Sequence, residues 1–138
     1  KIEQIDKPME IYNNPKSLFV AKFVGSPQMN IVNSKKDEKL ATSLSKKINI
    51  EKEKVKNFGI RPESMKMVKQ DDGDINGNIE TIQPTGADWI VGVNVYGKSL
   101  FLISSDPPIG KENDTVGIFF KPEDCHSFDD NDLRILKN

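Results

Sequence analysis

The sequence has little of the chemistry on which catalytic and metal centres usually depend, with one cysteine, one histidine and one tryptophan in 138 residues. A single thiol excludes an internal disulfide framework and is typical of a reducing compartment such as the cytoplasm. No stretch approaches the roughly 18–20 apolar residues that span a bilayer. Residues 1–15 also lack the apolar centre of a signal peptide. We therefore expect a cytoplasmic chain that forms one compact domain with a short additional arm.

Charge is divided unevenly along the chain. Residues 1–70 hold 15 Lys and Arg against 8 Asp and Glu, whereas residues 71–138 hold 5 against 13. Two alternatives account for this pattern: two solvated faces of one domain, or a dipolar surface that orients the domain against a partner. Nucleic acid is a poor partner, because the basic half has one arginine and lacks the interleaved aromatic residues of stacking platforms.

Residues 1–25 contain start and stop signals for two short helices. Pro8 opens the first, Asn13-Asn14-Pro15 interrupts it, and Gly25-Ser26-Pro27 ends the second. Two such helices bury little by themselves, so we expect them to dock onto something larger.

Most of the remaining chain predicts β-structure. Residues 34–56 are rich in Lys, Ser and Glu and show only a short apolar alternation near Ile48 and Ile50. Beyond them, apolar alternation between turn signals predicts strands within residues 57–62, 65–68, 75–82, 89–95, 99–103, 116–120 and 133–136. Short strands at this spacing favour a small β-barrel or sandwich.

Residues Gly92 to Ser99 satisfy the GxxxxGK[ST] pattern of a phosphate-binding loop. That loop requires a helix after it, whose N-terminus faces the phosphates. Here Val93 and Val95 alternate with polar residues as a strand does, and residues 100–103 continue as a second strand. We therefore predict a hairpin, with Lys98 as a turn lysine.

Other candidate sites are incomplete. His126 and its neighbour Cys125 offer at most two ligands, whereas zinc sites use three or four. Neighbours in a strand point to opposite faces, so the same two residues do not form a nucleophile pair. The acidic residues 71–74 lack the spacing and terminal Glu of a calcium loop. Arg61 and Glu63 could form a surface ion pair beside a strand end.

Three segments, taken in order, carry a resemblance to a known family. The first runs from Ile2 to Asn30 and ends in Gly25-Ser26-Pro27-Gln28-Met29-Asn30, the second is Gly59-Ile60-Arg61-Pro62-Glu63, and the third is Pro122-Glu123-Asp124-Cys125-His126-Ser127-Phe128. Together they resemble the end of the maltose-type ABC importer ATPases, the branch that serves maltose, multiple sugars and glycerol-3-phosphate.

The resemblance implies a division of the chain and a fold. Residues 1–25 would be the C-terminal remnant of a nucleotide-binding domain with its linker helices. Residues 26–138 would be a regulatory domain, mainly β, with an OB-type β-barrel and a TOBE element. The ATPase motifs of the family lie upstream of such a tail, and the chain opens at Lys1. We therefore expect a fragment with no catalytic, cofactor or metal residues, whose parent binds ATP and Mg²⁺ elsewhere.

The family also implies partners. These are a second copy of the domain, membrane permease subunits reached through the missing ATPase domain, and in some relatives a regulatory protein, at the inner face of the cell membrane. From the three motifs we expect interface or regulatory residues at Phe23, Gly25, Ser26, Met29, Asn30, Arg61, Glu63, His126 and Phe128.

An alternative is a small-oxyanion-sensing TOBE domain. Lys98, Ser104 and Ser105 are the local candidates for such a pocket, although Asp106 beside them is unfavourable.

Overall fold

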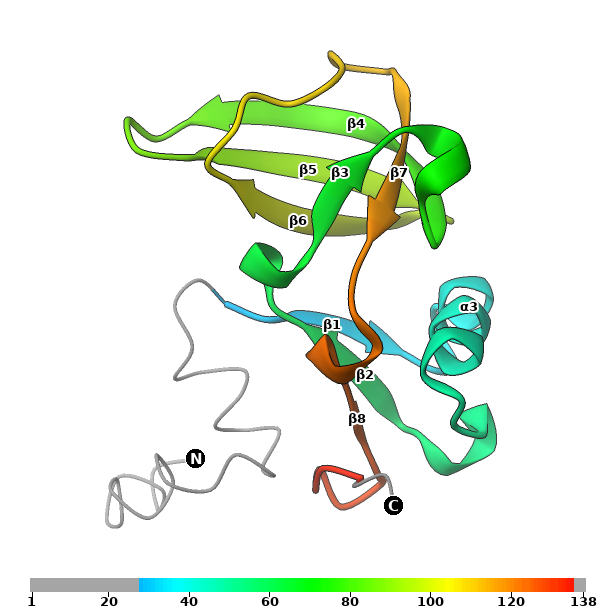
Figure 1. The fold of residues 1–138 in the computed structure, drawn as a ribbon. Helices are drawn as coiled ribbons and strands as arrows, with labels where there is room; N and C mark the ends of the chain where they lie inside the picture. The colour runs from blue at the N-terminus through cyan, green and yellow to red at the C-terminus, as the bar shows by residue number, and fades with distance from the viewer. Residues whose placement is uncertain (1–27, 136–138) are drawn as a thin grey trace, which may run out of the picture.

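The computed structural model describes residues 28–135, which form two antiparallel sheets and the helix α3 (Glu38–Ile48) (Figure 1). The smaller sheet has the order β1-β2-β8, with strands Asn30–Asn33, Asn57–Ile60 and Cys125–Phe128. The larger has the order β3-β7-β4-β5-β6, with strands Lys66–Val68, Thr115–Phe119, Ile75–Pro84, Trp89–Val95 and Lys98–Ser104. The helical arm expected over residues 1–25 lies outside the described residues.

Short 3₁₀ helices connect several of the strands. These are η2 (Lys52–Lys54), η3 (Pro62–Ser64), η4 (Gln70–Asp72) and η5 (Pro122–Asp124). Pro62 and Pro122 each stand at the start of their turn, where a fixed φ is favourable and no N–H is needed.

The larger sheet curls over an apolar core that it shares with α3 and the smaller sheet (Figure 1). Val91, Val93 and Leu102 from the β5–β6 hairpin are fully buried, as is Phe58 from β2. The mainly β, OB-type fold expected from the sequence is confirmed.

The imperfect alternation of residues 75–82 has a structural cause. The register between β4 and β5 shifts between Ile79 and Thr81, where a β-bulge inserts one extra residue. Ile79, just before the bulge, is buried. Because of the extra residue, Ile82 after the bulge also points inward and packs against the same core.

Two sequence expectations need correction. Residues 34–56 contain the helix α3, whose Leu40, Leu44 and Ile48 are buried at i, i+4 spacing; polar composition concealed this stripe. The strand expected over residues 133–136 is reduced, within the described part, to one bridge between Phe128 and Arg134. Residues 28–135 hold no helix of the length and apolarity that crossing a membrane requires.

Candidate functional site

The smaller sheet brings together residues from the three motif segments. In its centre, β2 pairs with β1 on one side and with β8 on the other. The motif ending in Asn30 therefore lies beside Gly59, and Gly59 lies beside His126. Motifs separated by up to about a hundred positions in the sequence thus form one surface.

Met29 and Phe128 form a small apolar cluster on this sheet, separate from the main core. Both are buried, and Ile31 packs against them. Gly59 makes the cluster possible, because a Cβ atom there would collide with the Met29 sulfur. Met29 and Phe128 are therefore packing residues, whatever further contacts they make.

Asn30 points inward and is 7% exposed. Its side-chain amide donates to the carbonyls of Ile60 and Phe101 and accepts the Phe101 N–H. Since β1 and β6 are edge strands of different sheets, this amide joins the two sheets. Phe101 did not stand out in the sequence, because nothing in a linear pattern marks it as the partner of Asn30.

His126 lies on the face of β8 opposite to the buried Cys125. Burial lowers the pKa of His126, and the Arg134 guanidinium lowers it further. Asp124 raises this pKa and Arg61 lowers it, by smaller amounts. The His126 Nδ1 atom is buried without a hydrogen-bond partner in the described part of the chain. The imidazole is therefore held neutral near pH 7, beside two arginines.

His126 and Arg134 line a hollow of about 400 Å³ at the edge of β8, between the end of α3 and residues 134–135. Cys125 also contributes to its wall, but burial raises the pKa of this thiol to about 12. The thiol is therefore protonated and unreactive.

The other predicted site residues do not join this cluster. Glu63 is exposed on η3, and none of the ion pairs between described residues joins it to Arg61. The expected Arg61–Glu63 pair is thus not formed. Phe23, Gly25 and Ser26 lie outside the described residues.

The apparent phosphate loop is a hairpin, as predicted. Strands β5 and β6 pair from Trp89–Ser104 to Val95–Lys98 and are joined by Tyr96 and Gly97, both at positive φ. This geometry is typical of the two-residue turns that match strand twist.

The residues expected to form an oxyanion pocket do not lie close together. Lys98 and Ser104 stand at opposite ends of β6, about 20 Å apart at the usual rise per residue. The Ser104 hydroxyl is also engaged, because it donates to the Asp106 carbonyl and accepts the Asp106 N–H. The three candidate residues do not converge on one ligand.

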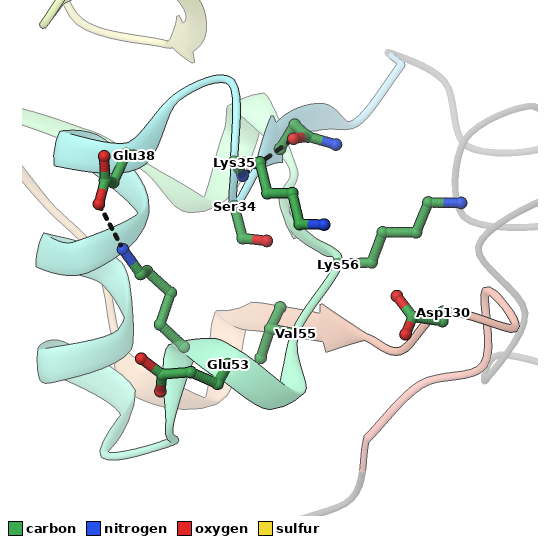
Figure 2. Close-up of a pocket in the computed structure, with 9 residues that line it drawn as sticks. Ser34, Lys35, Glu38, Glu53, Val55, Lys56 and Asp130 are labelled. Atoms are coloured by element: carbon green, nitrogen blue, oxygen red, sulfur yellow. Dashed lines mark hydrogen bonds and ion pairs between the residues drawn. The ribbon is translucent and has the colours of Figure 1, made fainter.

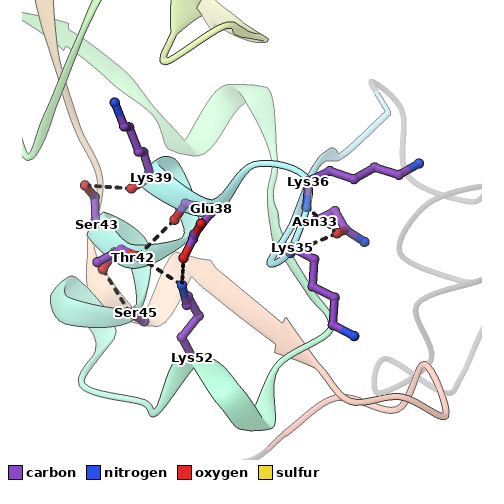
Figure 3. A network of polar contacts seen from close by, with 9 residues as sticks. All are labelled: Asn33, Lys35, Lys36, Glu38, Lys39, Thr42, Ser43, Ser45 and Lys52. Atoms are coloured by element: carbon purple, nitrogen blue, oxygen red, sulfur yellow. Dashed lines mark hydrogen bonds and ion pairs between the residues drawn. The ribbon is translucent and has the colours of Figure 1, made fainter.

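A further hollow, of about 650 Å³, lies beside the start of α3 (Figure 2). Lysines and carboxylates alternate around it, including Lys35, Lys56 and Asp130. Figure 3 shows one partnered pair in this wall: Lys52 Nζ lies 3.3 Å from both Glu38 Oε2 and Thr42 Oγ1. Exposed charges of both signs are typical of a solvated wall rather than of a binding centre.

Within residues 28–135, no three His, Cys, Asp or Glu side chains gather in a way that could hold a metal ion. The clustered features are therefore the packed motif residues of the smaller sheet and the outward face of the β5–β6 hairpin, which carries Phe101.

The fold and these motifs define a class of protein. The family model for the TOBE domain matches residues 58–128, which is 71 of the 138 residues, and the chain belongs to this family.

Individual relatives are ATP-binding proteins of ABC transporters. The chain is 33% identical to the sn-glycerol-3-phosphate import ATP-binding protein UgpC of Vibrio vulnificus (strain CMCP6), over 98% of the chain and 39% of the relative. It is 28% identical to the alpha-glucoside transport ATP-binding protein AglK of Rhizobium meliloti, over 94% of the chain and 40% of the relative. The chain is also 28% identical to the ABC transporter ATP-binding protein YcjV of Escherichia coli O6:H1, over 93% of the chain and 39% of the relative. The chain thus spans about two fifths of the length of the curated relatives it matches.

Proposed function

We propose that this chain is the C-terminal regulatory domain of the ATP-binding subunit of an ABC importer for a carbohydrate or a glycerol phosphate. The observation that carries the proposal is similarity to ATP-binding proteins over 93–98% of the chain. Two of those relatives are named for alpha-glucoside and glycerol-3-phosphate transport.

The proposed role is non-catalytic and depends on protein contacts. The one phosphate-loop pattern folds as a hairpin, and the thiol of Cys125 is buried with a raised pKa. The motif residues Met29, Asn30 and Phe128 serve packing and sheet closure. In the whole subunit, residues outside this chain would bind ATP and Mg²⁺.

The proposed partners follow from the same similarity. A second copy of the domain would pair with the first and keep two ATP-binding subunits together. The permease subunits would be reached through the ATPase part of the subunit, at the inner face of the membrane. A regulatory protein would act through the domain surface.

The test compares the whole subunit with a version that ends before residue 28. Both should bind ATP with similar affinity, whereas self-association in the absence of nucleotide should weaken at least about tenfold in the shortened protein, which is about 1.4 kcal/mol. Calorimetry on the 138-residue chain should detect no Mg-ATP binding. Nucleotide binding by the chain, or unchanged self-association after truncation, would reject the proposal.

A further inference from the structure

The outward face of β4, β5 and β6 is poor in charge. Strand register and exposure place ten residues on it, and Glu80 is the one charged residue among them. In a chain with 30% charged residues, this is a marked depletion. Depletion of charge around an aromatic residue is characteristic of the centre of a protein interface.

Phe101 lies on this face in the edge strand β6 and is 46% exposed. Its ring lies across Gly92, since a Cβ atom there would be 3.3 Å from the ring. Its backbone is fixed by Asn30 through two hydrogen bonds of 2.9 Å. An exposed aromatic residue that is already ordered loses little entropy on binding, which favours a role as an anchor.

Apolar surface continues on both sides of Phe101. Ile90 and Ile103, a cross-strand pair, are each partly exposed and line a hollow of about 360 Å³ together with Phe101. At the hairpin tip, Tyr96 is 62% exposed. Close to this tip, the Glu80 carboxylate of β4 accepts hydrogen bonds from Asn94 of β5 and Ser99 of β6 and so links the three strands.

Charge indicates which occupant suits this face. A contact about a two-fold axis brings each patch against itself, so a patch with net charge repels its own copy. Residues 35–56 hold eight lysines against four carboxylates, and residues 129–132 hold three aspartates. The β4–β5–β6 face carries Glu80, with Lys98 lining the hollow beside it, and so has no net charge to oppose self-contact.

We propose that the outward face of β4–β5–β6, with Phe101 as its exposed aromatic anchor, is the surface through which two copies of this chain pair. The inference rests on the proposed pairing of regulatory domains and adds the face that performs it. Phe101, Ile90 and Ile103 supply the apolar part of the surface, and Thr81, Gln83 and Ser99 supply uncharged polar groups beside it.

The experiment measures the self-association constant of the 138-residue chain by sedimentation equilibrium. Phe101→Glu should raise the dissociation constant at least tenfold, because it replaces the apolar anchor by a charge in both copies and leaves these charges desolvated within the contact. Leu133→Glu is the matched control. Leu133 is 47% exposed. It belongs to the segment after β8, which lies at the opposite end of the fold from β4, β5 and β6 (Figure 1). This control should leave the constant within about twofold of the wild type.

A second measurement does not depend on how well Phe101→Glu folds. Gln83→Cys places a thiol on the face, and a bifunctional thiol reagent long enough to span the face should give a covalent dimer in high yield. The same thiol at Asp130→Cys should not do so. Native Cys125 is buried and does not interfere.

The outcomes separate the two levels of the inference. If the wild-type chain pairs, but its pairing is insensitive to Phe101→Glu and the Gln83→Cys variant gives no covalent dimer, the assigned face is overturned and the proposed pairing stays intact. A wild-type chain that stays monomeric at millimolar concentration overturns both.

Discussion

The side-chain amide of Asn30 takes the place of a peptide group beside Phe101. Its Oδ1 accepts the Phe101 N–H at 2.9 Å, and its Nδ2 donates to the Phe101 carbonyl at 2.9 Å. The same Nδ2 donates to the Ile60 carbonyl at 3.2 Å. One side chain therefore closes the seam between the edge strands β1 and β6.

Replacing Asn30 should open this seam. Asn30→Ala leaves the Phe101 N–H and carbonyl without their partner, and an unsatisfied buried group costs about 1–3 kcal/mol. Urea titration should therefore show a loss of about 2 kcal/mol, and hydrogen exchange at the Phe101 amide should accelerate. Asn131→Ala, at an exposed position, is the control. An unchanged Phe101 exchange rate would contradict the proposed closure.

Gly73 and Gly117 should not tolerate alanine. A Cβ atom on Gly117 would lie 2.6 Å from the Lys69 carbonyl oxygen and 2.9 Å from the Gly73 Cα, both backbone atoms that cannot move aside. We expect Gly117→Ala to lower the free energy of unfolding by about 1–3 kcal/mol or more. At Gly110 the nearest atoms belong to the Asp114 side chain, so Gly110→Ala should cost much less. Thermal unfolding of both variants distinguishes the two positions.

The ion pair between Lys47 and Asp74 links α3 to the larger sheet. Their charged atoms are 2.9 Å apart, the side chains are 22% exposed, and Asp74 also accepts the Phe120 N–H. A double-mutant cycle with Lys47→Met and Asp74→Asn should give a coupling of about 0.5–1 kcal/mol that weakens at high salt. The pair Lys54–Glu51, whose side chains are 70% exposed, should couple close to zero. Equal couplings would contradict the argument from exposure.

Stability should fall in acid through His126. The pKa of this group is lowered in the folded protein, so below the unfolded value of about 6.5 the unfolded chain binds more protons than the folded one. The contribution of His126 to the free energy of unfolding is therefore fully present above about pH 6.5, and it is lost as the pH falls toward the pKa of the folded state. Urea unfolding at pH 8 to 5 should show a shallower loss in His126→Gln. Identical pH profiles would mean that the histidine is equally solvated in both states.

Cys125 should be inert in the folded chain. Burial raises the pKa of its thiol to about 12, so at pH 8 the thiolate fraction is on the order of one in ten thousand. A colourimetric thiol reagent should react with the wild type only at the rate of unfolding, and rapidly after denaturation. Gln83→Cys, at an exposed position, should react within seconds and serves as the positive control.

Much of the fold can be predicted from local pattern. The sequence predicts the β5–β6 hairpin to within a residue or two, because Val91, Val93 and Val95 alternate and Tyr96-Gly97 supplies the turn. The same alternation excludes the phosphate loop. The helix α3 is not evident from the sequence, because Leu40, Leu44 and Ile48 are separated by Lys, Ser and Thr that dominate the composition.

For the candidate site, too, the sequence predicts some features and not others. Motif resemblance identifies Met29, Asn30, His126 and Phe128, and strand pairing does bring these residues to one small sheet. The roles of the residues do not follow from the motifs. Met29 and Phe128 pack around Gly59, and Asn30 faces inward to Phe101.

The sequence by itself determined the class of this chain: a charged, mainly β domain with one thiol, one imidazole and motifs of an importer subunit. Local alternation and turn residues are properties of neighbouring positions, so they can be read directly. Only the tertiary structure decided that Asn30 meets Phe101, 71 positions away, and that β4, β5 and β6 share an outer face with few charges. Such relationships depend on the register and closure of sheets, which long-range packing fixes and no short stretch of sequence encodes.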